Sequence, residues 1–253
     1  MRLTALPAFA DNYIWTLGDD RGAIIVDPGQ AEPVLAAVAA GLRPLAILLT
    51  HHHDDHVGGV SELQQAFPEL PVYGPEDARL SFPMHSVSDG QALQVQGFSF
   101  EVMAVPGHTR SHVAYYGEGV LFSGDTLFSL GCGRMFEGTA PQMFASLRRL
   151  AGLPASTQVC CGHEYTLSNA QFALQVDPSN AALQRRLQEA QAMREAARPT
   201  LPVSLASELA TNPFLRTQDA AIQQAVAARL GRAAADEVEV FAELRRWKDD
   251  FRA

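Results

Sequence analysis

The sequence lacks the features of several large classes of protein. No run of about 18 apolar residues occurs, so we expect no membrane-spanning helix and no membrane partner. Its three cysteines, Cys132, Cys160 and Cys161, form neither a disulfide framework nor a CxxC metal knuckle. The first 15 residues resemble neither a signal peptide nor a transit peptide. We therefore expect a cytoplasmic protein.

Lysine is also nearly absent. The 19 basic residues are 18 arginines and a single lysine, Lys248, and with 28 acidic residues they give a net charge of −9. Nucleic-acid binding depends on clustered basic residues, and no such cluster occurs, so we expect no nucleic-acid partner. Genomic composition is the simplest explanation for this excess of arginine, and Lys248 is the one exception to it.

The hydrophobic pattern predicts a mixed sheet covered by helices, followed by a helical region. With 253 residues, of which 47% are hydrophobic, the chain is long enough for one large domain or for a main domain with a smaller partner. Short apolar runs predict strands at residues 23–26, 45–49, 72–73, 98–105, 113–116, 120–122 and 158–161. Helical patterns cover residues 32–40, 59–67, 141–150, 166–198 with a break at 177–180, 204–209, 217–230 and 235–251.

Four of the eight histidines lie within residues 51–56, directly after a predicted strand. His51 and His53 are two apart, so in extended chain their side chains point to the same side and can bind one ion. Asp55 and His56 lie beyond the turn and could serve a second ion. Imidazole and carboxylate ligands fit zinc, iron and manganese, so the ligands leave the metal open. A solvated polar loop is the alternative interpretation.

Three further strand ends carry a glycine and then one histidine or aspartate. These are Gly107-His108, Gly124-Asp125 and Gly162-His163. Each alone is weak evidence, because a lone His or Asp after a strand is more often a turn or cap residue. Together with residues 51–56 they supply seven ligands, enough for two ions.

These motifs resemble the ligand set of the metallo-β-lactamase fold superfamily. The resemblance implies an αββα sandwich with two metals at one edge. It implies that His51, His53 and His108 bind the first metal and that Asp125 bridges both. The ligands of the second metal would be Asp55, His56 and His163.

Other motifs narrow the resemblance to glyoxalase II, the hydroxyacylglutathione hydrolases. They are residues 131–139 (GCGRMFEGT), 161–166 (CGHEYT), 212–216 (NPFLR) and 245–249 (RRWKD), and the similarity extends from residue 11 to the last helix. We therefore predict an αββα catalytic domain over residues 1–164 and a small helical substrate-binding domain over residues 165–253.

The resemblance also implies a set of glutathione-binding residues: Arg134, Phe136, Tyr165, Arg245 and Lys248. One common form of the family has Lys and Tyr in place of Arg134 and Phe136. The arginine keeps the charge, whereas the phenylalanine lacks a hydroxyl, which affects substrate affinity more than activity. Arg245 and Lys248 are three apart on a predicted helix and share a face. On that spacing alone a solvated face is the simpler interpretation, and the resemblance favours carboxylate binding.

The predicted activity is hydrolysis of S-(2-hydroxyacyl)glutathione, chiefly S-D-lactoylglutathione, to glutathione and D-lactate. This is the second step of methylglyoxal detoxification. The resemblance implies two divalent ions, zinc first, with iron or manganese as alternatives. In this hypothesis a hydroxide that bridges the ions attacks the thioester carbonyl. The residues that hold this hydroxide would be His51, His53, Asp55, His56 and Asp125.

Other functions stay open at this point. A persulfide dioxygenase or a lactonase of the same superfamily would share the ligands, and the dioxygenase would use a single iron. Neither explains the helical C-terminal third with Arg245 and Lys248. A catalytically silent metal-binding scaffold would be expected to lose ligands. We expect a monomer that binds a small glutathione thioester.

Three residues near these motifs have simpler explanations. Asp27 is predicted to be a turn residue, with a hydrogen bond to a ligand histidine as the lesser alternative. We expect His112 to lie in the core or beside a ligand rather than to bind metal. Cys132 is predicted to be a small packing residue and not a nucleophile.

Overall fold

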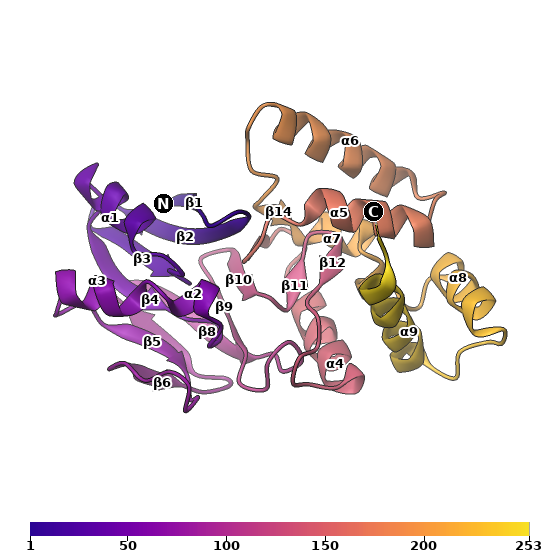
Figure 1. The fold of residues 1–253 in the computed structure, drawn as a ribbon, viewed down its shortest axis with the longest axis horizontal. Helices are drawn as coiled ribbons and strands as arrows, with labels where there is room; N and C mark the ends of the chain where they lie inside the picture. Colours follow the sequence, from indigo (N-terminus) through magenta and orange to yellow (C-terminus); the bar gives the residue numbers. More distant parts are fainter. Residues whose placement is uncertain (253) are drawn as a thin grey trace. The chain divides into compact units, whose positions relative to one another are not determined.

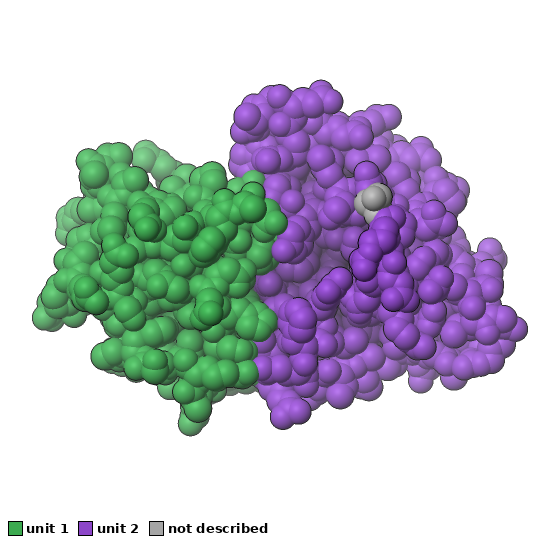
Figure 2. Space-filling view, in the orientation of Figure 1, with its two compact units in different colours: residues 1–104, 111–124, 160–163 green, residues 105–110, 125–159, 164–253 purple. Residues whose placement is uncertain are grey.

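The computed structural model describes residues 1–252 as two compact units (Figures 1 and 2). Unit 1 comprises Met1–Ala104, Ser111–Gly124 and Cys160–His163. Unit 2 comprises Val105–Arg110, Asp125–Val159 and the described residues from Glu164 onward. The predicted boundary between residues 164 and 165 stays a prediction, since these units follow spatial compactness and interleave along the chain.

Strands occupy mainly the first two-thirds of the described chain. They are β1 (Arg2–Ala8), β2 (Asn12–Asp19), β3 (Gly22–Val26), β4 (Pro44–Leu48), β5 (Val72–Pro75), β6 (His85–Val87), β7 (Ala92–Val95), β8 (Phe98–Ala104), β9 (Val113–Gly117), β10 (Val120–Gly124), β11 (Leu127–Phe128), β12 (Gly131–Cys132), β13 (Gln158–Cys161) and β14 (Val203–Ser204).

Helices occupy mainly the last third, as the hydrophobic pattern predicts. They are α1 (Glu32–Ala39), α2 (Asp54–Val57), α3 (Val60–Ala66), α4 (Ala140–Ala151), α5 (Thr166–Val176), α6 (Ala181–Glu195), α7 (Leu205–Thr211), the 3-10 helix η1 (Pro213–Leu215), α8 (Ala220–Leu230) and α9 (Glu237–Asp250). Within residues 1–252, none of the helices has the length and apolar character needed to cross a membrane.

Unit 1 contains a six-stranded sheet in the order β1-β2-β3-β4-β5-β6. Strands β3, β4, β5 and β6 pair in parallel, with Val26 opposite Leu48. Parallel neighbours end at the same edge of a sheet, so the residues after β3 and after β4 lie side by side. Helices α1 and α3 bury Val34, Val60 and Leu63 in one core cluster with residues of β3 and β4. This packing fixes the sheet edge from which residues 50–56 emerge.

Unit 1 also holds an antiparallel set of strands in the order β10-β9-β8-β7, with Cys160 and Cys161 of β13 beside β10. Gly162 N donates to Gly124 O (3.0 Å), and Tyr13 N donates to Gly162 O (2.8 Å). The residues before His163 are thereby held between the ends of two other strands.

Unit 2 contains helices α4 to α9 and the short β11–β12 hairpin. Helix α4 begins at a capping box formed by Thr139 and Gln142, which satisfies the first backbone N–H groups. Helices α5, η1 and α9 share an aromatic cluster in which Phe172 packs against Phe214 and Trp247 (ring centroids 5.9 and 5.6 Å apart). Burial of such rings stabilises this helical region.

Candidate active site

The first pair of predicted ligands follows strand β4. Thr50 and His51 are fully buried, and Thr50 O accepts a hydrogen bond from Val113 N (2.9 Å). His53 is the N-cap of α2 with extended backbone angles, so His51 and His53 point to the same side. His51 Nε2 lies 3.0 Å from His53 Nδ1. Two imidazole nitrogens that converge in this way fit one divalent ion, and this agrees with the spacing argument from the sequence.

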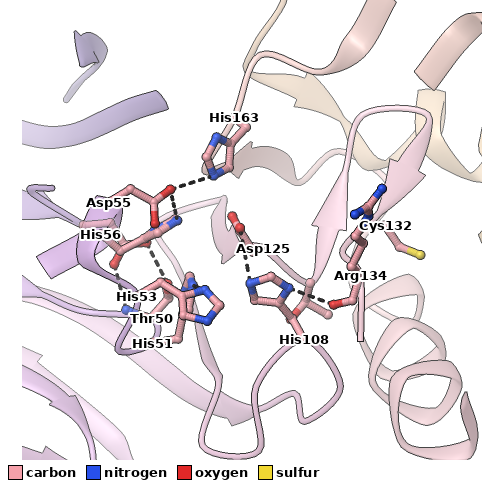
Figure 3. Close-up of polar contacts among 12 residues, drawn as sticks. Thr50, His51, His53, Asp55, His56, His108, Asp125, Cys132, Arg134 and His163 are labelled. Atoms are coloured by element: carbon pink, nitrogen blue, oxygen red, sulfur yellow. Dashed lines mark hydrogen bonds and ion pairs between the residues drawn. The ribbon is translucent and has the colours of Figure 1, made fainter. Parts of the chain in front are cut away.

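His56, Asp55 and His163 form a second convergent group in unit 1 (Figure 3). The Nε2 atoms of His56 and His163 lie 3.7 and 3.3 Å from Asp55 Oδ2. The other ring nitrogens are also held: His56 Nδ1 lies 2.9 Å from Asp27 Oδ2, and His163 Nδ1 lies 2.8 Å from Asp11 Oδ1. A carboxylate on one imidazole nitrogen orients the ring and leaves its opposite nitrogen directed at a metal. The geometry therefore fits a bound ion.

Asp27 and Asn12 extend this group. Asp27 accepts hydrogen bonds from Thr50 N (2.8 Å) and Thr50 Oγ1 (2.7 Å), and it has a left-handed backbone with φ of 52°. Asn12 Nδ2 donates to Asp55 Oδ2 (2.9 Å). Asp27 thus contacts His56, a predicted ligand, which is the lesser of the two alternatives for this residue.

The remaining two predicted ligands lie together in unit 2 (Figure 3). His108 Nε2 is 3.5 Å from Asp125 Oδ2, and His108 Nδ1 is 2.8 Å from Arg134 O. His108 is 4% exposed and Asp125 is 6% exposed. This pair repeats the arrangement in unit 1, in which one imidazole nitrogen contacts a polar group of the chain and the other faces a carboxylate.

The predicted glutathione-binding cations lie within unit 2, on α9 and on the segment after β12. Arg245 is 3% exposed, and its guanidinium donates to Cys132 O (2.7 Å) and to Asp249 Oδ1 (2.9 Å). Arg134 Nε lies 3.4 Å from the same Asp249 oxygen. Lys248 Nζ lies 3.3 Å from Ser168 O. Arg134 and Lys248 are therefore more accessible to a substrate than Arg245, which holds the backbone beside them.

The ionisation of Lys248 is perturbed. Burial, followed by the charges of Arg245 and Arg134, lowers its pKa to about 8, and Asp249 opposes this change. The ammonium also lies 5.6 Å from the ring centres of both Phe172 and Phe251. Lys248 is therefore a cation at neutral pH that loses its proton far more readily than an ordinary lysine.

The two predicted aromatic residues differ in their surroundings. Phe136 is 64% exposed, and its ring lies 5.3 Å from that of His108. Tyr165 packs edge-on against Phe128 at 5.3 Å. A large apolar side chain with this exposure beside a ligand histidine is a candidate for contact with a substrate.

Two family models together match nearly the whole chain. The model of the metallo-β-lactamase superfamily matches residues 10–163, and the model of the hydroxyacylglutathione hydrolase C-terminus matches residues 164–251. A curated hydroxyacylglutathione hydrolase from Xanthomonas axonopodis pv. citri (strain 306) is 68% identical over 255 residues, covering 100% of both chains. The chain belongs to the hydroxyacylglutathione hydrolase family.

Solved structures place this member of the hydroxyacylglutathione hydrolases in the metallo-β-lactamase fold. The BLEG-1 B3 metallo-β-lactamase is similar with a TM-score of 0.63 and 28% identity, covering 85% of this chain and 100% of that one. TTHA1623 in a di-iron-bound form has a TM-score of 0.55 and 33% identity, covering 64% and 92%. The predicted α/β fold with a helical C-terminal region is therefore confirmed.

Apart from Asp27, the sequence motifs did not identify the side chains that contact the predicted ligands. Asp11 and Asn12 were read only as the start of the resemblance, although both contact the Asp55 and His163 group. The available signal was chemical: Asp11 and Asn12 are adjacent polar residues at the entry to a buried strand, and such residues need partners.

Proposed function

We propose that the protein hydrolyses S-(2-hydroxyacyl)glutathione, chiefly S-D-lactoylglutathione, to glutathione and D-lactate, the second step of methylglyoxal detoxification. The observation that carries this proposal is the group of Asp55, His56 and His163, held from behind by Asp11 and Asp27, in a chain of the hydroxyacylglutathione hydrolase family. We also propose a cytoplasmic monomer, with the catalytic domain at residues 1–164 and the substrate-binding domain at residues 165–253.

The proposed metal centre uses seven ligands. We propose that Asp125 bridges two divalent ions, zinc in the first place, with iron or manganese as alternatives. One ion would be held by His51, His53 and His108, and the other by Asp55, His56 and His163. When bound, such ions lower the pKa of water and polarise a carbonyl group.

Residues of the chain orient these predicted ligands, and the hydrolysis requires little proton transfer by side chains. Asp27 and Asp11 fix the ring orientation of His56 and His163, and the Arg134 carbonyl does so for His108. Water adds to the thioester carbonyl carbon, the C–S bond breaks and glutathione leaves as a thiolate that takes up a proton. Because a thiolate is a good leaving group, the reaction does not depend on a strong general acid.

The substrate-binding residues position the glutathione part and do not take part in bond breaking. We propose that Arg134, Lys248 and Arg245 provide positive charge for its carboxylates. Phe136 and Tyr165 would contact its apolar and amide parts. Arg245 would act through the field of a guanidinium that is bound to Cys132 O and Asp249.

Neighbouring carboxylates on α2 provide a matched test. Asp54 is exposed and belongs to none of the metal-ligating groups found among the described residues, whereas Asp55 contacts both ligand histidines. We expect the unmodified protein to contain two metal ions per chain and to hydrolyse S-D-lactoylglutathione. Asp55→Asn should lose one metal equivalent and at least about 100-fold in kcat, whereas Asp54→Asn should retain both.

Oxygen uptake with glutathione persulfide separates this function from the dioxygenase alternative. One iron per chain with oxygen consumption and no thioester hydrolysis would refute the proposal. Equal metal content and equal kcat in Asp54→Asn and Asp55→Asn would refute the role of Asp55.

A further inference from the structure

Side chains from three helices bind the backbone of residues 128–132, which leads directly to Arg134; we call residues 128–134 the anchored segment. Asn212 Nδ2 donates to Phe128 O (3.2 Å) and Gly131 O (2.9 Å). Asn169 Nδ2 of α5 donates to Ser129 O (3.0 Å). Arg245 of α9 donates to Cys132 O, so side chains bind the carbonyl groups of four of the five residues 128–132, all except Leu130. The conformation of this segment is therefore set by side chains as well as by the hairpin itself.

Glu208 of α7 is the centre of these contacts and is fully buried. Its two oxygens accept hydrogen bonds from Ser129 Oγ (2.9 Å), Leu130 N (2.8 Å) and Asn212 Nδ2 (3.0 Å). Leu130 has a φ of 60°, a left-handed conformation that costs a non-glycine residue about 1–2 kcal/mol. A carboxylate that accepts the N–H of this residue stabilises the turn in that conformation.

Burial of polar groups at this position is costly unless each is hydrogen-bonded. Asn169, Glu208 and Asn212, which we call the anchoring cluster, are 5%, 0% and 0% exposed. Apolar side chains would fill the same space without this desolvation cost, but they could not bind backbone N–H and C=O groups. The cluster thus fixes one particular backbone path, which simple packing would not do.

The anchored segment ends at Arg134, which has two roles at the proposed site. Its carbonyl lies 2.8 Å from His108 Nδ1, and its side chain is one of the exposed cations near Lys248. Phe128, at the other end, packs against Tyr165. A shift of the segment would therefore move a hydrogen-bond acceptor of a ligand histidine together with substrate-binding side chains.

We infer that Asn169, Glu208 and Asn212 are positioning residues that orient His108 and Arg134 through the backbone of residues 128–134. This inference rests on the proposed function for the roles of His108 and Arg134. The hydrogen bonds described for the anchoring-cluster side chains go to the anchored segment, to one another and to Phe214 N, so their effect on His108 would pass through Arg134 O and the direction of the Arg134 side chain.

Two substitutions in the cluster and one matched control test this inference. Glu208→Gln keeps the shape but replaces an acceptor with a donor, and Asn169→Ala removes a single hydrogen bond and is the milder change. Asp219→Ala removes the N-cap of α8 and the ion pair with Arg216 in the same unit, and it should cost about 1–2 kcal/mol of stability without removing a hydrogen bond to the anchored segment. The control separates general destabilisation from loss of positioning.

We expect both cluster variants to bind one of the two zinc ions about 10- to 100-fold more weakly than the unmodified protein. Loss of a residue that orients a metal ligand through a hydrogen bond typically has an effect of this size. KM for S-D-lactoylglutathione should rise about three- to tenfold because Arg134 is displaced. Asp219→Ala should have the same zinc affinity and the same KM as the unmodified protein. In the metal-free protein, the NMR signal of the His108 ring Nδ1–H should shift in Glu208→Gln and stay in place in Asp219→Ala.

The outcomes distinguish this inference from the proposed function. If the unmodified protein fails to hydrolyse the thioester, the proposed function fails, and zinc affinity and the His108 signal still decide whether the cluster positions His108. If both cluster variants behave like Asp219→Ala in zinc affinity, KM and the His108 signal, the cluster contributes only to stability and the inference is wrong.

Discussion

Lys248 is charged at neutral pH and loses its proton within the range that an enzyme assay covers. Its pKa is lowered to about 8 by burial and by the neighbouring Arg245 and Arg134, while Asp249 favours the charged form. A lysine is a cation below its pKa and neutral above it. At a pKa of about 8, about 90% of the side chains are charged at pH 7 and about 10% at pH 9.

Substrate affinity should therefore fall as the pH rises through 8. A neutral amine cannot form an ion pair with a glutathione carboxylate, and a half-exposed pair of this kind contributes about 1 kcal/mol, or about a fivefold change in KM. Weighted by the charged fractions, KM should rise about three- to fourfold between pH 7 and pH 9 from this cause. The effect on kcat should be small, because the proposed role of Lys248 is to position the glutathione part and not to take part in bond breaking.

Two substitutions isolate this charge in measurements of KM and kcat at pH 7, 8 and 9. Lys248→Ala should have a KM about fivefold higher than the unmodified protein at pH 7, and its KM should not show the three- to fourfold rise between pH 7 and pH 9. Lys248→Arg stays charged throughout and should also lack the rise. The α-amino group of the glutathione part titrates near pH 8 with every variant, so comparison between variants removes its contribution.

The same pH dependence of KM in the unmodified protein and in Lys248→Arg would show that Lys248 does not bind substrate through its charge. A large fall in kcat without a change in KM in Lys248→Ala would also contradict the binding role. An unchanged KM at pH 7 in Lys248→Arg would mean that the lone lysine is not specifically required.

Three further substitutions test contacts around the ligands. Asp27→Asn should weaken metal binding about 10- to 100-fold in chelator competition, because the carboxylate holds His56 Nδ1. Phe136→Tyr should lower KM about two- to fivefold at unchanged kcat, through one added hydrogen bond of about 0.5–1 kcal/mol. Gly124→Ala should reduce the free energy of unfolding in urea by about 1–3 kcal/mol, since φ is 48° and an added Cβ would lie 2.8 Å from the His112 ring.

Each of these expectations has a contrary outcome. Wild-type metal affinity in Asp27→Asn would mean that the Asp27 carboxylate does not tune His56. A higher KM in Phe136→Tyr would indicate that the site excludes a hydroxyl there. Unchanged stability in Gly124→Ala would show that residues 112 and 124 separate more easily than their packing indicates.

Burial alone did not decide which strands the sequence predicted: β2 was missed although seven of its eight residues are buried, because Thr16 and Gly18 interrupt its apolar run. β3, β4 and β10 are almost completely buried and appear as continuous apolar runs. β1 was not predicted, because it is half-exposed, contains Pro7 and lacks a regular alternation. The helix α2 was expected to be a loop; its four residues are too few to show a helical period.

The site was predicted as far as its residues lie in compact motifs. The spacing of His51 and His53 already implied convergent side chains, and the structure confirms their convergence at 3.0 Å. The anchoring of the segment before Arg134 was not predicted, because Glu208 contacts residues 78 and 79 positions away. No local pattern reports such a contact, and only the packing of α7 against the hairpin brings the atoms together.

The same reasoning explains why the sequence indicated the predicted ligands but not the groups that contact their second ring nitrogens, except for Asp27 as the lesser alternative. His56, His163 and His108 each use Nδ1 for a contact that lies 29, 152 and 26 residues away. Only a few residue types can bind a metal ion, so predicted ligands form a recognisable sequence motif. The group that accepts a hydrogen bond from the second ring nitrogen can be any carboxylate or even a backbone carbonyl. For His108 that acceptor is the carbonyl of Arg134, so no side chain at position 134 encodes it. The orientation of the His108 ring then depends on what fixes the backbone at Arg134, and this is the physical basis for the inferred effect of a residue as distant as Glu208 on the proposed metal centre.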